Sequence, residues 1–217
     1  GEWRGPMGFG ADLRGRTVGI HGCGHIGKEV VKLLQPYGVK ILACDKVDYG
    51  EFYKQWGVEQ VSVDDLLAEL DPVGVILSGG GDLSSQGADA ADRDAVERKF
   101  LAWAQSRGRP VFAVCRGMQH LLTLSGADLV SVAGHVGQPH TVQFSDGSLR
   151  EVNSFHNWGL RTLPDGFETL ATAPDGTIEA ARHRSAPILC VMWHPERMSP
   201  FAAEDQSLLK QHFGTHS

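Results

Sequence analysis

The feature that most constrains the fold is a repeated order of elements, in which a short apolar run is followed by a loop and then by a helical pattern. The apolar runs, each as long as a buried strand, lie at residues 17–21, 40–44, 58–61, 73–77 and 110–114. The helical patterns lie at residues 26–34, 64–70, 89–106 and 118–124. Strands that alternate with helices favour a parallel sheet covered on both faces. We therefore expect an α/β fold with three layers, a mostly parallel central sheet flanked by helices, of the flavodoxin-like or Rossmann-like kind.

The pattern changes after about residue 130. Period-two alternation and turn residues predict hairpin strands, followed by an apolar strand and a closing helix. These elements are expected at residues 141–144, 150–152, 178–182, 188–193 and 204–213. Residues 1–16 are expected to form an irregular arm. Because no apolar run approaches the roughly 20 residues of a membrane span and the N-terminus is not signal-like, the sequence predicts a cytoplasmic protein with no membrane partner.

Charge, cysteine and glycine content narrow the possible functions. A formal charge of −6 and an isoelectric point near 5.9 argue against a nucleic-acid partner. The four cysteines are too few and too dispersed for a disulfide scaffold, and no Cys-x-x-Cys pair suggests structural zinc. The 27 glycines cluster mainly after predicted strands, where α/β proteins place their binding loops.

One glycine cluster, Gly22-x-Gly24-x-x-Gly27, lies between a predicted strand and a predicted helix. Such glycines permit a tight turn, a close approach of a pyrophosphate and close packing of helix on strand. Asp45 follows Gly27 by 18 residues, at the end of the next strand, where a carboxylate would accept from a ribose hydroxyl. These four residues are candidate NAD ligands. The alternative, which we favour, is that the unit supplies only strands and a helix to a sheet.

The segment around this cluster resembles a known family. Gly15-Arg-Thr-Val-Gly-Ile-His-Gly-Cys-Gly-His-Ile-Gly27 and Tyr37-Gly-Val-Lys-Ile-Leu-Ala-Cys-Asp45 look like the NAD-binding segment of D-2-hydroxyacid dehydrogenases. The likeness covers about residues 10–70 and then stops. The catalytic and substrate-binding residues that this family carries further along have no counterpart here, so we expect no dehydrogenase activity.

A second motif, Pro110-Val-Phe-Ala-Val-Cys115-Arg-Gly-Met-Gln119, is an apolar strand that ends in a cysteine at the start of a helix. A nucleophile on such a sharp turn needs small neighbours, and Ala113 and Gly117 supply them at positions −2 and +2. The helix N-terminus is expected to favour the thiolate, and the Arg116 N–H is placed to meet an oxyanion. The alternative is a buried core cysteine.

Two further motifs favour catalysis over a core cysteine. His194 and Glu196 follow the last apolar strand, where the imidazole could act as base to Cys115 and the carboxylate could orient it. The loop Ser78-Gly-Gly-Gly-Asp82 ends another strand, and its amides could complete an oxyanion hole. Together these elements form a set of nucleophile, base, orienting group and oxyanion donors.

This set resembles that of class I glutamine amidotransferases, over about residues 71–213. The resemblance implies Cys115 as nucleophile, His194 as base and Glu196 as orienting residue. It also implies an oxyanion hole of the Gly80 and Arg116 backbone N–H groups, with Gln119 against the glutamyl moiety. Ala113 stands where many members have glycine, which keeps the small residue that the turn requires.

A finer resemblance links the chain to γ-glutamyl-CDP-amidate hydrolases. It rests on the stretches Gly134–His140, Arg150–Gly159, Asp175–Ala180 and His194–Phe201. A diphosphate substrate would need donors, for which the candidates are Arg116, His135, His140, His156 and Arg197. The histidine gaps of 5 and 16 residues, on loops with no carboxylate nearby in the motif, argue against a metal site. For His156 we expect a role in shaping the glutamyl pocket, with a backbone-satisfied histidine as the alternative.

The two resemblances meet near Asp71, so the chain is expected to be a chimera, natural or engineered. We expect an arm over residues 1–16, a Rossmann-like βαβ segment over 17–72 and an amidotransferase-like segment over 73–217, within one continuous sheet. The predicted function is hydrolysis of a γ-glutamyl amide through a glutamyl thioester, without a required cofactor. Released amine or ammonia would pass to a separate synthetase or transferase, or to solvent. The alternatives are an NAD-binding module without catalysis and an inactive scaffold.

Overall fold

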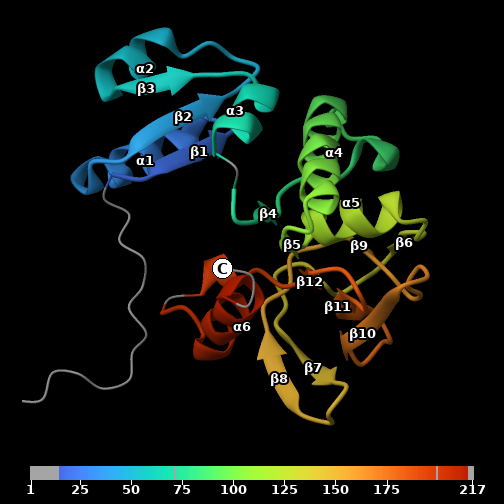
Figure 1. The fold of residues 1–217 in the computed structure, drawn as a ribbon. Coiled ribbons are helices and arrows are strands. Elements are labelled where there is room, and N and C mark those ends of the chain that lie inside the picture. The colour runs from blue at the N-terminus through green and yellow to red at the C-terminus, as the bar shows by residue number, and fades with distance from the viewer. Residues whose placement is uncertain (1–14, 71, 199, 215–217) are drawn as a thin grey trace, which may run out of the picture. The chain divides into compact units, whose positions relative to one another are not determined.

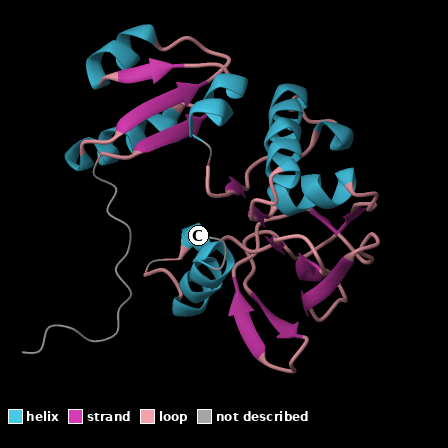
Figure 2. Ribbon diagram, viewed as in Figure 1, coloured by secondary structure: helices cyan, strands magenta, loops and turns pink. Residues whose placement is uncertain are grey.

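The computed structural model describes residues 15–70, 72–198 and 200–214. The predicted arm over residues 1–16 falls almost wholly outside this part of the chain. The chain divides into two compact units, Gly1–Asp71 and Pro72–Ser217, and Figures 1 and 2 show the elements of each. Within the described residues, no helix combines the length and the apolar character needed to cross a membrane.

The first unit is a small parallel α/β sheet. In chain order its strands and α-helices are β1 (Thr17–His21), α1 (His25–Leu34), β2 (Lys40–Cys44), α2 (Gly50–Trp56), β3 (Val58–Gln60) and α3 (Val63–Leu70). The strands pair in parallel in the order β1-β2-β3, and the central strand β2 is the most buried. Its core contains Cys23, Val31, Ile41, Ala43, Tyr53 and Val58.

The second unit is built on a seven-stranded mixed sheet. Its described α-helices and strands are β4 (Val75–Leu77), α4 (Ala91–Ser106), β5 (Val111–Val114), α5 (Arg116–Leu124), β6 (Val130–Ser131), β7 (His140–Phe144), β8 (Leu149–Val152), β9 (Trp158–Gly159), β10 (Phe167–Thr172), β11 (Ile178–His183), β12 (Ile188–Val191) and α6 (Ala203–Gly214). The sheet order is β4-β5-β12-β11-β10-β7-β8, while β6 and β9 form a separate ribbon.

Alternation along β5 separates two apolar layers of this unit. Val111 and Ala113 pack into one core cluster with residues of α4 and α5, such as Leu101 and Met118. Phe112 and Val114 point to the opposite face, where their cluster receives residues of α6. Helices therefore cover both faces of the strands that carry the predicted nucleophile, as the α/β prediction requires.

Two details differ from the expected topology. In the larger sheet only β4, β5 and β12 are parallel, because the turn-rich region after residue 130 adds its strands in antiparallel hairpins. The strands before and after Asp71 also belong to different sheets, so the expectation of one continuous sheet is wrong for the described strands. Apolar strand patterns predict burial but not which strand is the neighbour.

Candidate active site

Cys115 occupies the sharp turn between β5 and α5. Its backbone angles are φ 48° and ψ −106°, and it is the only non-glycine residue with positive φ in the described part of the chain. The neighbouring glycine is sterically required, because a Cβ on Gly117 would lie 2.5 Å from the carbonyl oxygen of Leu77. Ala113, at the other small position, is fully buried. The turn therefore has the strand-to-helix geometry that the sequence predicts, and it holds Cys115 in a strained conformation.

The thiol of Cys115 is protonated more firmly than an ordinary cysteine. Burial raises its pKa to about 11, and the negative charges of Glu196 and Glu179 act in the same direction. The backbone N–H of Arg116 lowers the pKa, as expected at a helix N-terminus, but burial outweighs it. The N-terminus of the helix thus favours the thiolate as expected, but burial determines the net direction of the pKa shift. A base is needed to take the proton.

His194, which follows β12, is positioned by contacts to its ring and to its backbone. Its Nδ1 lies 2.7 Å from a carboxylate oxygen of Glu196, two residues further along the short turn that begins at Pro195. The Asn153 side chain makes two hydrogen bonds with the backbone of His194. It donates to the carbonyl oxygen and accepts from the N–H, both at 2.8 Å. Sequence reasoning missed Asn153, although it lies in a quoted motif, because nothing local indicates its distant partner.

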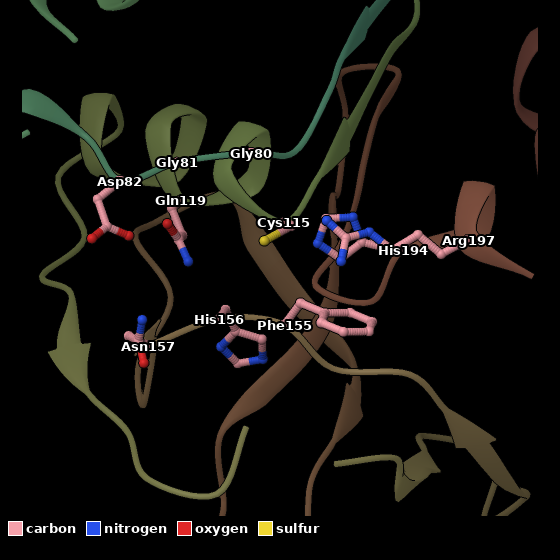
Figure 3. A pocket seen from close by; sticks show the side chains of 10 residues that line it. All are labelled: Gly80, Gly81, Asp82, Cys115, Gln119, Phe155, His156, Asn157, His194 and Arg197. Atoms are coloured by element: carbon pink, nitrogen blue, oxygen red, sulfur yellow. The ribbon is translucent and has the colours of Figure 1, made fainter. Parts of the chain in front are cut away.

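The Nε2 atom of His194, which does not contact Glu196, is the ring nitrogen suited to act as a base. When Nδ1–H donates to Glu196, Nε2 carries the lone pair. This Nε2 is buried and has no hydrogen-bond partner among the described residues, Cys115 included. His194 and Cys115 nevertheless line one pocket (Figure 3). A Cβ added to Gly79 would lie 2.5 Å from His194 Cε1 and 3.4 Å from Cys115 Cβ, so this glycine leaves room between them.

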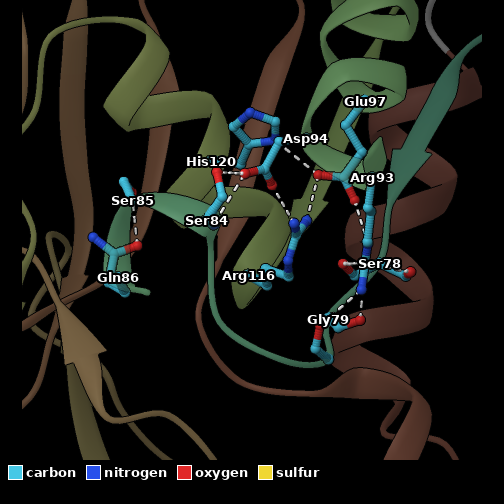
Figure 4. Close-up of polar contacts among 11 residues, drawn as sticks. Ser78, Gly79, Ser84, Ser85, Gln86, Arg93, Asp94, Glu97, Arg116 and His120 are labelled. Carbon is cyan, nitrogen blue, oxygen red and sulfur yellow. Dashed lines mark hydrogen bonds and ion pairs between the residues drawn. The ribbon is translucent and has the colours of Figure 1, made fainter. Parts of the chain in front are cut away.

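The loop after β4 is held from outside the pocket by Arg93 on α4 (Figure 4). The guanidinium donates to the carbonyl oxygens of Ser78, Gly79 and Gly80 at 2.9, 3.1 and 2.7 Å. In a trans peptide the C=O and the following N–H point in opposite directions. Arg93 therefore turns the Gly80 N–H away from itself, an orientation suited to an oxyanion donor in the pocket that Gly80 lines.

The side chain of Arg116 points away from this pocket into a buried charge network. It forms ion pairs with Asp94 and with Glu97, the latter at 2.5 Å, and Glu97 also contacts His120 at 2.8 Å. Figure 4 shows these groups between α4 and α5. The prediction that this guanidinium binds a diphosphate is therefore wrong, because it is 1% exposed and fully paired. Only its backbone N–H remains available beside Cys115.

The other predicted substrate residues divide into two groups. Gln119, His156 and Arg197 line the pocket with Cys115. Gln119 donates to the carbonyl oxygen of Trp158 at 2.8 Å, and the Arg197 guanidinium lies 4.2 Å from the centre of the Phe155 ring. Of the polar groups predicted to bind a diphosphate, Arg197 is the exposed cation in this pocket.

His135 and His140 are absent from the pocket lining, and their rings pack together with a centroid separation of 4.7 Å. The ring of His156, which does line the pocket, lies equally close to that of His135. All three approach the buried carboxylate of Glu179. Sequence reasoning missed Glu179, although it lies in the quoted stretch Asp175–Ala180, because nothing local indicates its distant histidine neighbours.

The candidate NAD residues in the first unit adopt the predicted strand, turn and helix. Gly22 has φ 84°, and a Cβ on Gly27 would lie 2.2 Å from the carbonyl oxygen of Gly22, so both positions require glycine. Gly24 precedes α1 as its N-cap. The Asp45 carboxylate accepts a 2.6 Å hydrogen bond from the Cys23 N–H, so one of its oxygens already holds the glycine loop.

Comparison with known proteins defines the class of this arrangement as class I glutamine amidotransferase-like. Residues 57–196 match the family model of Peptidase C26, and the chain belongs to that family. Residues 1–81 match a second model, the NAD binding domain of D-isomer specific 2-hydroxyacid dehydrogenase. Both resemblances found in the sequence are thereby confirmed, and the two matches overlap over residues 57–81.

Several curated relatives of the chain are named as hydrolases of γ-glutamyl compounds. A Campylobacter jejuni γ-glutamyl-CDP-amidate hydrolase is 35% identical over 125 residues, which cover 57% of this chain and 62% of that protein. The γ-glutamyl-γ-aminobutyrate hydrolase PuuD of Escherichia coli is 28% identical over 172 residues, covering 62% and 67%. The chain thus matches less than two thirds of the Campylobacter relative's length.

Solved structures with the same fold include a Thermoplasma acidophilum protein described as part of a GMP synthase. It superposes with a TM-score of 0.60 at 20% identity, covering 95% of this chain and 94% of that one. A glutamine amidotransferase from Methylobacillus flagellatus gives a TM-score of 0.52 at 13% identity, covering 91% and 76%. At these identities the likeness concerns the fold alone.

Proposed function

We propose that the protein is a cysteine-dependent hydrolase that cleaves a γ-glutamyl amide. The observation that carries this proposal is the strained Cys115 turn, which shares a pocket with a His194 ring already oriented by Glu196. Strain of this kind persists at functional sites because the surrounding structure imposes it, whereas a core cysteine has no need of it. The names of the relatives support the same reaction class.

The reaction proceeds in two balanced steps. Cys115 Sγ attacks the γ-carbonyl carbon while its proton passes to His194 Nε2, and the Gly80 and Arg116 N–H groups stabilise the oxyanion. Collapse breaks the C–N bond, and the amine leaves with the proton from His194, so that a glutamyl thioester remains. Water then attacks the thioester with His194 again as base, and glutamate and the free thiol are released.

Arg197 favours a substrate whose leaving group is anionic. It is the exposed cation of the pocket, beside Phe155, so a phosphate and an adjoining base or sugar would find a charge and an aromatic face together. A γ-glutamyl nucleotide amidate has this chemistry. Glutamine and small γ-glutamyl amines are the simpler members of the same class.

The test is glutamate release from glutamine, a γ-glutamyl anilide and a γ-glutamyl nucleotide amidate. We expect Cys115→Ala to abolish turnover. Glu196→Gln should lower kcat by about tenfold to a hundredfold. General acid–base catalysis contributes roughly 10²–10⁴ to the rate. We expect a smaller loss here because the Glu196 side chain is 55% exposed and water can replace it. Turnover by the Cys115→Ala protein equal to that of the unchanged chain would refute the proposal.

The first unit supports a second candidate function, binding of NAD. The supporting observation is the glycine loop at the N-terminus of α1, where Gly22 and Gly27 both exclude side chains. Asp45 already accepts from the N–H groups of Cys23 and Val47, and its remaining lone pairs would accept from a ribose. Calorimetric titration with NAD and NADH tests this function, with Asp45→Ala as the variant expected to weaken binding, and an absence of heat would exclude it.

A further inference from the structure

Three histidine rings of the second unit surround one buried carboxylate, that of Glu179 on β11. Its Oε1 lies 3.4 Å from His135 Nδ1, 3.4 Å from His156 Nε2 and 3.6 Å from His140 Nε2. Glu179 is fully buried and the side chains of His135 and His156 are at least 95% buried. We call these four residues the histidine–glutamate cluster. A charged carboxylate at this depth requires a cation.

The facing atoms of the cluster make no hydrogen bonds. Both oxygens of Glu179 and the three histidine nitrogens that approach it have no hydrogen-bond partner among the described residues. The unpartnered oxygens and ring nitrogens of the cluster therefore converge on a single point.

The outer nitrogens of two rings are fixed by neighbours. His135 Nε2 lies 3.3 Å from the Asp175 carboxylate, and His156 Nδ1 lies 3.0 Å from the carbonyl oxygen of Trp158. Because a carboxylate and a carbonyl oxygen only accept, each outer nitrogen donates, and in the neutral imidazole the lone pair of the other nitrogen faces Glu179. Metal-binding histidines have this arrangement, in which the second ring nitrogen donates to a carboxylate or a backbone carbonyl.

The spacing distinguishes a metal ion from a shared proton. A charge-assisted hydrogen bond between an imidazolium and a carboxylate is about 2.7–2.9 Å long, shorter than any of the three separations. Zinc bonds of about 2.0–2.1 Å in tetrahedral geometry place two ligand atoms about 3.3 Å apart. The ligand atoms of His135, His156 and Glu179 all lie within 4.8 Å of one another, so one ion can reach all three.

A second cluster of carboxylates and a histidine in the same unit has its negative charge balanced by an arginine side chain. Asp94, Glu97 and His120 also lie within ligand distance of one another. There the Arg116 guanidinium already supplies the cation, with ion pairs to both carboxylates. No arginine or lysine of the described residues forms an ion pair with Glu179, whose neighbours are the three histidines.

We propose that His135, His156 and Glu179, with His140 beside them, bind a divalent transition metal, and that this ion is Zn²⁺. Two imidazoles and one carboxylate are a ligand set that zinc adopts, and His140 or water completes four-coordination. The ion joins the loop before β7 to the loop after β8. Because His156 also lines the catalytic pocket, next to Phe155 and Asn157, the metal holds that wall of the pocket in place.

The test is the metal content of the full chain. The protein is stripped with a chelator, incubated with Zn²⁺ alone, desalted and measured by mass spectrometry of the metal. We expect about one equivalent of zinc in the unchanged chain and a loss of at least tenfold in affinity for Glu179→Gln and for His135→Gln. Stripped protein incubated with Co²⁺ should show the visible absorption of a tetrahedral site, and both variants should lose it.

Matched controls separate this site from the other possible ligands. His183→Gln removes a histidine outside the cluster, and Cys115→Ala removes the catalytic thiol, so both variants should retain the metal. Circular dichroism establishes that Glu179→Gln and His135→Gln remain folded. Unchanged zinc affinity in these two variants, or no zinc retained by the unchanged chain, would overturn the proposal. Because metal content is measured without a substrate, this result is independent of the hydrolase proposal.

Discussion

At the scale of single residues, Cys115 combines a strained backbone with a thiol that resists ionisation. Burial raises its pKa to about 11, so the protonated thiol predominates at pH 7. In the proposed reaction, His194 takes the proton during the attack on substrate, when the developing oxyanion makes the transfer favourable.

This protonation state has a measurable consequence for alkylation. The rate of Cys115 modification by iodoacetamide should rise about tenfold per pH unit between about pH 7 and pH 10, because the reactive thiolate increases until the pKa near 11 is reached. Peptide mass spectrometry follows this site separately from Cys23, Cys44 and Cys190. A rate that is already constant above pH 8 would show instead that His194 holds a thiolate in the free protein.

At the scale of elements, Arg93 couples helix α4 to the loop after β4. Its three bonds to loop carbonyls orient the amides proposed to stabilise the oxyanion. We expect Arg93→Met to lower kcat by about tenfold to a hundredfold with little change in KM, because the oxyanion exists only in the transition state. Steady-state kinetics test this, and Arg98→Gln, at an exposed position of the same helix, should leave kcat unchanged. Equal effects on kcat and KM would contradict it.

A buried carboxylate of helix α6, that of Asp205, binds two side chains of the sheet region. Asp205 accepts from Arg150 on β8 at 2.9 and 2.5 Å, and from the indole N–H of Trp193 at 3.1 Å. Asp205→Asn leaves the Arg150 charge without its partner and should lower the free energy of unfolding of this unit by about 3 kcal/mol. Denaturant titration checks the value. Glu168→Gln, in an exposed pair with Arg182, should cost under about 1 kcal/mol.

How well the elements could be predicted depended on how local their causes are. The Cys115 turn follows from an apolar strand, two small residues and a helix start within ten residues, and it was foreseen. The strand β10 and the helix α2 were not predicted, because their hydrophobic patterns are weak and tertiary packing determines their secondary structure. Arg93, Asn153 and Glu179 act on partners 13 to 44 residues away, and no local spacing reveals such contacts.

At the scale of the whole molecule, the apolar cores of the two units share no residue. The buried core residues of the first unit lie between Cys23 and Val58 and include Ile41. All buried core residues of the second unit follow Pro72 in the sequence. Ile41→Ala should therefore destabilise the first unit by about 2–5 kcal/mol and leave γ-glutamyl hydrolysis unchanged. Hydrogen exchange over residues 17–70 and the hydrolysis assay check the two halves. A fall in kcat with this variant would show that the units are coupled.

The division into units also explains why the expected continuous sheet was wrong. Both segments carry right-handed βα units, and the sequence pattern of such units is compatible with either a shared or a separate sheet. The hydrogen-bond pattern shows which strands share a sheet: β1, β2 and β3 form one sheet, and β4 belongs to another. The family of each segment was predictable from its motifs, whereas the pairing of its strands was not.

The positive φ of Cys115 has a consequence for how this sequence changes over generations. Glycine tolerates that backbone conformation, so a change of Cys115 to glycine would relieve a strain of about 1–3 kcal/mol while removing the thiol. Stability and chemistry thus oppose each other at this codon. In a lineage that no longer needs the reaction, selection for stability would favour replacement of the cysteine. Retention of Cys115 in a homologous gene therefore indicates selection for the thiol.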